Sequence, residues 1–219
     1  MSEAWDAYRA HWRHLIPIAF VVYVLIALLA VLLALVLGWI GVVIGGLIGL
    51  AGVFWIQGAL VLAIEDVRDG RADLSIRETL DRVRPRLNTL TVAGVLAAFA
   101  VGVGLLLFVV PGLVLLTIWL LIVPVIMLEG AGVIRSFGRS RELVSGHGWS
   151  VFGVIVLTLL VLILIEIIAG IVAGVFDSSV ADVVVDIATR TLTAPFIALA
   201  WTMTYYHLRA VETAPASAT

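Results

Sequence analysis

The hydrophobic residues fall into long, almost uninterrupted runs instead of short alternating stretches. These runs occupy residues 15–37, 40–64, 90–110, 113–128, 149–175 and 187–208. Most are close to the ~20 residues that an α-helix needs to cross a hydrocarbon core of about 30 Å. Because lipid offers no water to bond an exposed backbone, each run is expected to be a helix. The pattern predicts an all-α integral membrane protein with six transmembrane helices.

One apolar stretch, residues 90–128, is nearly twice as long as a single crossing, and Pro111 and Gly112 lie near its middle. Proline ends an incoming helix, and glycine tolerates a positive φ. We therefore predict that Pro111 and Gly112 form a hairpin turn between the third and fourth spans. Since the fourth span is short, a re-entrant segment is the alternative.

The distribution of arginine gives the orientation. All 13 basic residues are arginine, and with six crossings twelve of them share a side with both termini, whereas only Arg190 lies opposite. This asymmetry predicts cytoplasmic termini. A re-entrant fourth span would place Arg135, Arg139 and Arg141 on the other side and weaken the asymmetry. We expect one transmembrane domain over residues 1–209, followed by a small, polar, disordered tail over 210–219.

Short stretches with helical spacing of apolar residues precede each pair of spans, near residues 5–15, 76–87 and 134–144. Ser136 and Ser140 also match Ser75 and Thr79 at a constant offset. The sequence thus predicts three transmembrane hairpins, each preceded by a cytoplasmic interfacial amphipathic helix, and ancestral triplication is a hypothesis. These helices either anchor the hairpins or bind anionic lipid headgroups. The candidate headgroup contacts are Arg77, Arg82, Arg84, Arg86, Arg135 and Arg139.

Charged residues inside apolar runs are costly, so each needs a partner or water. Glu166 and Arg190 fall at comparable depth in the fifth and sixth spans, and we predict that they pair. The simpler explanation of these two charges is a structural salt bridge or snorkelling to the interface, and a proton or ion pathway is the alternative. Gln57 is the one obvious further interior polar group. Near the cytoplasmic boundary, Glu129 is expected to engage Arg135, Arg139 or another nearby arginine, and an ordinary hydrated boundary is the alternative.

Gly41, Gly45 and Gly49 recur every fourth residue in the second span and form a candidate helix-packing face. This face serves either packing within one bundle or association between two copies of the chain, or with another membrane protein.

The composition excludes several chemistries. The absence of lysine and cysteine rules out disulfides, thiolate nucleophiles and Schiff-base lysines. The net charge of −2 gives no basic field for nucleic acid. Histidines at positions 11, 14, 147 and 207 fall near one interface, but interfacial histidines usually present an apolar body and a polar tip. We expect no metal, cofactor or catalytic residue, because no nucleophile and base converge with the acids.

Four motifs resemble a large family of bacterial six-span membrane proteins, which includes the membrane domain attached to some glycerophosphodiester phosphodiesterases. They are Pro111-Gly112, the "VPVIMLEG" run, "SFGRSRELVSGHGW" and "YYHLR" ending at Arg209. The resemblance implies a fold class in the bacterial cytoplasmic membrane and no catalysis, since the phosphodiesterase site of such proteins belongs to a separate domain.

We therefore expect a non-enzymatic protein with a structural, scaffolding or envelope-homeostasis role. The alternative is a transporter or channel for a lipid or small solute, which a cavity passing Glu166 and Gln57 would favour. A lipid-modifying enzyme is a third interpretation, which lacks the residues that such chemistry needs.

Overall fold

The computed structural model describes residues 2–68, 76–176 and 178–213, without the side chains of residues 2–15, 18, 67, 76, 176, 179 and 181. Within these ranges the fold is entirely helical. The elements are α1 (Ser2–Leu37), α2 (Trp39–Arg68), α3 (Ile76–Val83), the 3₁₀ turn η1 (Arg84–Arg86), α4 (Leu87–Leu107), α5 (Val109–Ile118), α6 (Ile122–Glu129), α7 (Val133–Val144), α8 (Gly148–Phe176) and α9 (Ser179–Thr213).

Six helical segments are long and apolar enough to cross a membrane, as predicted. They are Ala19–Leu37, Trp39–Asp66, Arg77–Leu107, Val109–Glu129, Gly148–Val175 and Asp182–Thr213. Helix α8 exposes large apolar side chains along much of its length, among them Leu164, Ile167 and Ile171. Such a surface suits lipid contact. The chain therefore has the helices of a multi-pass membrane protein.

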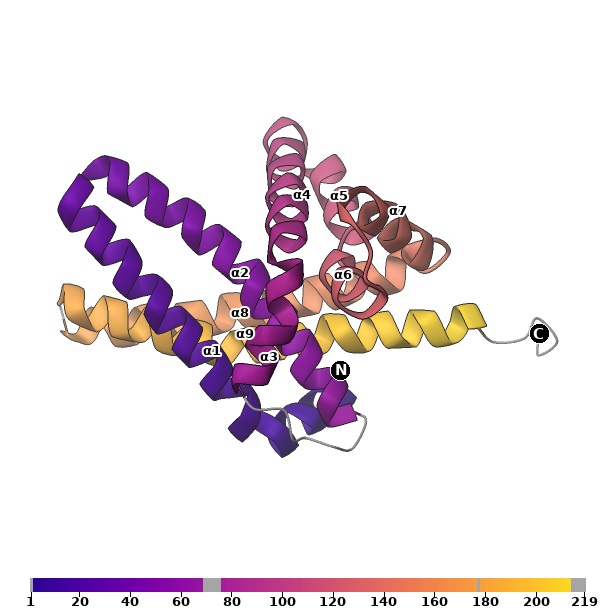
Figure 1. Cartoon of the computed structure of the whole chain (residues 1–219), viewed down its shortest axis with the longest axis horizontal. Coiled ribbons are helices and arrows are strands. Elements are labelled where there is room, and N and C mark those ends of the chain that lie inside the picture. Colours follow the sequence, from indigo (N-terminus) through magenta and orange to yellow (C-terminus); the bar gives the residue numbers. More distant parts are fainter. Residues whose placement is uncertain (1, 69–75, 177, 214–219) are drawn as a thin grey trace.

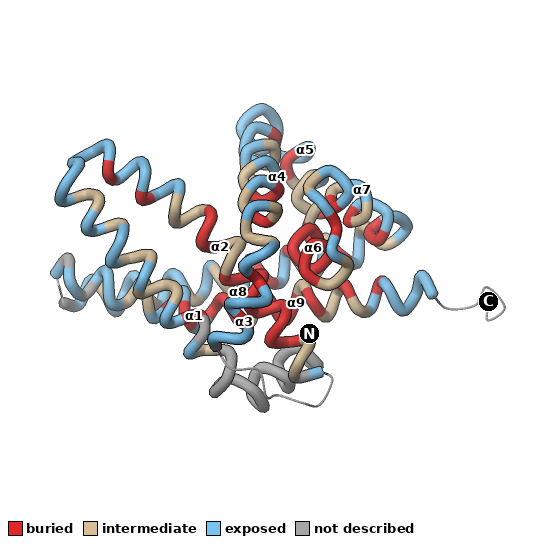
Figure 2. Tube along the Cα trace, viewed as in Figure 1, coloured by how far each residue is buried: buried red, intermediate tan, exposed pale blue. Residues whose placement is uncertain are grey.

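The helices diverge from a shared core. Helices α1 and α2 pack along each other, as do α4 with α5 and α8 with α9. In Figure 1 the α1–α2 pair, helix α4 and the α8–α9 pair point in three different directions. Buried residues concentrate where α2, α6 and α9 meet, whereas the far ends of α1, α2 and α4 are exposed (Figure 2). The largest fully buried apolar side chains of this core include Ile56, Leu60, Leu90, Ile126 and Leu199.

The chain reverses between α4 and α5 at Phe108, so the prediction that Pro111 and Gly112 form the turn is wrong. Phe108 has extended backbone (φ −153°, ψ 132°), whereas Pro111 and Gly112 lie in the first turn of α5. Proline is tolerated there because the first turn of a helix has no internal partner for its N–H. A Cβ on Gly112 would lie 2.5 Å from the Leu105 nitrogen. Gly112 therefore permits the close approach of α5 to α4.

The fourth membrane-length segment is a discontinuous helix, because α5 ends at Ile118 and α6 begins at Ile122. Pro124 lacks the N–H that would continue the ladder to Leu120. Ser140 of α7 occupies the break. Its hydroxyl donates to the Ile118 carbonyl (2.8 Å) and accepts from the Leu121 N–H (3.2 Å). A side chain from a neighbouring element thus bonds the freed backbone groups that lipid could not.

The glycine stripe of α2 packs partly within the chain. A Cβ on Gly41 would overlap the Leu33 carbonyl, and one on Gly45 would lie 3.2 Å from Ala30. Gly49, by contrast, has nothing within 4 Å of such a Cβ. Gly41 and Gly45 therefore let α2 approach α1, and Gly49 leaves open space.

The C-terminal helix is longer than predicted. Helix α9 continues to Thr213, so residues 210–213, which were assigned to a disordered tail, are helical. The physical reason is Glu212, whose carboxylate is bonded by Arg139 of α7. The remainder of that tail lies outside the described residues.

Candidate functional site

Among the described residues, several polar contacts converge on Arg139, at the place where α6, α7 and α9 meet. Its Nε lies 3.1 Å from Glu129 Oε2 at the end of α6. Its two terminal nitrogens lie 2.7 and 2.6 Å from the two carboxylate oxygens of Glu212. A longer contact of 3.5 Å reaches Glu142, three residues on in α7. One guanidinium therefore joins three helices, and the predicted contact between Glu129 and Arg139 is confirmed.

A tyrosine from α9 completes this cluster. The Tyr205 hydroxyl donates to Glu129 Oε1 at 2.9 Å, and Arg209 donates to the Tyr205 oxygen at 3.2 Å. Tyr205 is fully buried and packs with Leu121 and Val125. We call Glu129, Arg139, Glu142, Tyr205 and Glu212 the Arg139 cluster.

Arg139 carries a permanent charge in this cluster. The hydrogen bond to Glu212 raises the pKa of Arg139 above its usual range, with a further contribution from Glu129, while burial acts in the opposite direction. An arginine is protonated at every physiological pH in any case. Arg139 therefore acts as a fixed cation that holds two carboxylates from other helices.

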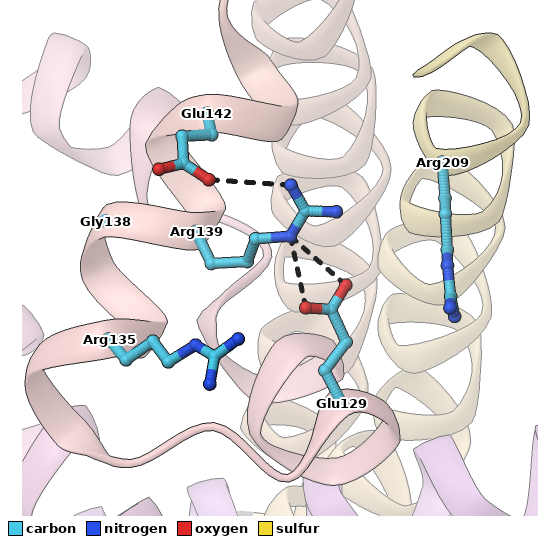
Figure 3. Close-up of a pocket in the computed structure, with 6 residues that line it drawn as sticks. All are labelled: Glu129, Arg135, Gly138, Arg139, Glu142 and Arg209. Atoms are coloured by element: carbon cyan, nitrogen blue, oxygen red, sulfur yellow. Dashed lines mark hydrogen bonds and ion pairs between the residues drawn. The ribbon is translucent and has the colours of Figure 1, made fainter. Parts of the chain in front are cut away.

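Beside the cluster lies an open pocket of about 700 Å³ (Figure 3). Arg135 and Arg139 enter it from α7, and Arg209 enters from α9. Arg135 is exposed and makes no ion pair within the described part of the chain. The pocket thus contains Arg139, which is bonded to carboxylates of the same chain, and Arg135, which has no ion pair among the described residues. The lining residues are Glu129, Arg135, Gly138, Arg139, Glu142 and Arg209.

Two of the six arginines predicted to contact lipid headgroups have partners within the chain. Arg139 belongs to the cluster, and Arg86 donates to the Met127 carbonyl and, at 3.2 Å, to the Ile126 carbonyl. These carbonyls belong to the last turn of α6, where acceptors lack helical partners. Arg86 is half-buried, and its guanidinium bonds the end of α6. The remaining candidates, Arg77, Arg82, Arg84 and Arg135, are exposed.

The predicted pairing of Glu166 with Arg190 is not found among the described ion pairs. Arg190 bonds Asp186 one helical turn earlier, with Nε–Oδ distances of 2.7 and 2.8 Å. Glu166 is exposed on α8 and acts on Arg190 only electrostatically, without a hydrogen bond. An i,i+4 partner on the same helix is closer than any carboxylate on a neighbouring helix, which explains the correction.

A cavity of about 500 Å³ lies between α1, α2 and α9. Its described lining includes Asp186, Arg190 and Gly49, but neither Glu166 nor Gln57. Gln57 is instead buried within α2, and its Oε1 has no hydrogen-bond partner in the described ranges. The cavity therefore does not follow the path that we expected for a carrier.

The histidines are only partly described. The side chains of His11 and His14 lie outside the described residues. His147 precedes α8, and His207 is exposed on α9.

Three residues that take part in the contacts around Arg139 were not predicted from the sequence to do so. Tyr205, Arg209 and Glu212 stand at helical spacing, which could have shown that the last helix continues past residue 209. Ser140 had a signal in its offset match with Thr79, and both are fully buried.

Comparison with known proteins adds no relative: no protein-family model matches the sequence, and neither the curated proteins nor the solved structures include a match to it. The resemblance to the six-span bacterial family therefore stays a prediction.

Proposed function

We propose that the chain is a non-enzymatic multi-pass protein with a scaffolding role in a bacterial cytoplasmic membrane. The observation that carries this proposal is the Arg139 cluster, in which the charged groups bond one another across three helices. Residues with this arrangement serve to fix helices in place, and a fixed surface is what a scaffold presents. The resemblance to the six-span family agrees with such a role.

The same proposal includes the arrangement of the chain in the membrane. Three hairpins, α1–α2, α4–α5 and α8–α9, span the bilayer, with both termini in the cytoplasm. Support comes from the contacts within each pair and from the twelve-to-one distribution of arginine. Helices α3 and α7 lie at the cytoplasmic interface, where their exposed arginines, Arg77, Arg82 and Arg135, meet anionic lipid.

A carrier for a lipid or small solute is the second candidate function. The observation in its favour is the α1–α2–α9 cavity, which contains two charged side chains inside a membrane-length segment. Intramembrane charges that face a cavity commonly mark a substrate or ion route.

One complementation experiment separates the two functions. In a bacterium that carries the gene, deletion should increase uptake of a membrane-impermeant dye, and the wild-type gene should restore the barrier. Gly49→Leu fills the cavity without touching the Arg139 cluster, whereas the double variant Glu129→Gln, Arg139→Gln breaks the cluster and leaves the cavity open.

For a scaffold we expect Gly49→Leu to restore the barrier and the double variant to fail although it is present in the membrane. The opposite outcome would support the carrier. A deletion strain with a normal barrier would contradict the envelope role.

A further inference from the structure

The cavity between α1, α2 and α9 is lined on the α2 side by three glycines together with Leu50 and Val53. Gly46 and Gly49 face it from α2, and a Cβ at either position would meet nothing within 4 Å. Tyr23 and Ala30 of α1 form the opposite wall. Its volume of about 500 Å³ falls within the range of about 300–1,000 Å³ that is usual for small-molecule sites.

Among the described lining residues, the charged groups are Asp186 and Arg190, and Tyr23 adds a phenol hydroxyl. Asp186 and Arg190 of α9 contribute a carboxylate and a guanidinium, whereas most of the other lining residues are aliphatic or glycine. Both charged side chains are about half exposed, at 50% and 51%. They therefore face the opening and are not sealed inside the protein.

Arg190 has hydrogen-bond donors that its contact with Asp186 does not use. Its Nε bonds both carboxylate oxygens of Asp186, and its two terminal nitrogens have no hydrogen-bond partner among the described residues. Paired guanidinium donors of this kind match the oxygens of a phosphate. The Asp186 carboxylate accepts from only one nitrogen and can accept further bonds.

This pair lies near one end of the sixth apolar run. Arg190 comes three residues after the start of the run at residue 187, about 5 Å along the helix. Water or a polar headgroup stabilises a charge at such a boundary. One cation beside one anion is complementary to a ligand that carries both signs.

We propose that this cavity binds a zwitterionic phospholipid, with the headgroup phosphate on Arg190, the headgroup amine on Asp186 and an acyl chain along the aliphatic and glycine wall. A soluble zwitterion would leave the apolar part of the cavity unfilled, whereas a lipid uses both parts. This inference does not rest on the scaffolding role, because a scaffold can hold a lipid without moving it.

The test is native mass spectrometry of the full chain in detergent, titrated with phosphatidylethanolamine or with phosphatidylglycerol of the same acyl chains. We expect a single retained phosphatidylethanolamine that binds about ten-fold more tightly than phosphatidylglycerol. Gly49→Leu should weaken this binding by about ten-fold, because the new side chain fills the cavity. Gly170→Leu is the matched control, since Gly170 of α8 also has open space around it and lies outside the cavity.

The double variant Asp186→Asn, Arg190→Gln removes both charges together and so leaves no unpaired charge in the membrane. It should lose the preference for phosphatidylethanolamine while eluting as the wild type does in gel filtration. Equal binding of the two lipids by the wild type, or equal losses for Gly49→Leu and Gly170→Leu, would overturn the proposal. Displacement of the lipid by soluble phosphoethanolamine at similar concentration would also overturn it and assign the site to a soluble zwitterion.

Discussion

At the residue scale, Glu129 has the central place in the Arg139 cluster. Its two carboxylate oxygens accept from Arg139 and from Tyr205, and its side chain is 18% exposed. Glu142 contacts the same guanidinium but is 68% exposed and bonds at 3.5 Å. Water can replace the contact of Arg139 with Glu142 because Glu142 is exposed. Water cannot fully replace the contact with Glu129, because a charge that is already mostly shielded from water has no other partner when this contact is lost.

We therefore predict that Glu129→Gln lowers the free energy of unfolding by about 1.5–3 kcal/mol, whereas Glu142→Gln changes it by less than about 0.5 kcal/mol. Thermal melting of the two variants in the same detergent measures the difference. Equal melting temperatures would show that the cluster does not hold α6 to α7 and α9.

At the scale of elements, the interrupted helix α5–α6 depends on a side chain from α7. Ser140 bonds one backbone group on each side of the break. Ser136, one turn earlier, is equally buried, but its hydroxyl donates to Val133 within its own helix. The two serines have the same burial and different partners, so they form a matched pair.

Ser140→Ala should lower the free energy of unfolding by about 1–3 kcal/mol, because it leaves a partly buried carbonyl and a buried N–H without partners. Ser136→Ala should change it by less, because the Val133 carbonyl belongs to the helix ladder of α7. Hydrogen exchange adds a local readout, with faster exchange near Leu121 expected in the first variant alone. Identical exchange in both variants would mean that water or a backbone shift satisfies the break.

The lengths of the apolar runs predicted the helical segments, since the thickness of a membrane fixes how many residues a crossing needs. They did not predict where the backbone breaks. Phe108 and Trp119 are apolar like their neighbours, so the sequence does not mark them as breaks. Pro111 gave a wrong prediction because proline is accommodated in the first turn of a helix as well as in a turn between helices. The pairing of Arg190 with Asp186 follows from their i,i+4 spacing on one helix, a signal that the sequence contains and that the prediction of a pair with Glu166 passed over.

At the scale of the whole molecule, the proposed orientation places the α7–α8 connection in the cytoplasm and the α8–α9 connection outside. The chain contains no cysteine, so a single introduced thiol reports its position without background. Ser145 and Ser178 are exposed, lie in these two connections and differ from cysteine by one atom. They provide a matched pair for labelling.

A membrane-impermeant maleimide added to intact cells should label Ser178→Cys and leave Ser145→Cys unlabelled until the membrane is opened with detergent. Six crossings with cytoplasmic termini require this result, because helix α8 carries the chain once across the bilayer between the two positions. Labelling of Ser145→Cys alone would show that the orientation is the opposite one, with the exposed arginines of α3 and α7 outside the cell. Labelling of both in intact cells would mean that α8 does not cross the membrane.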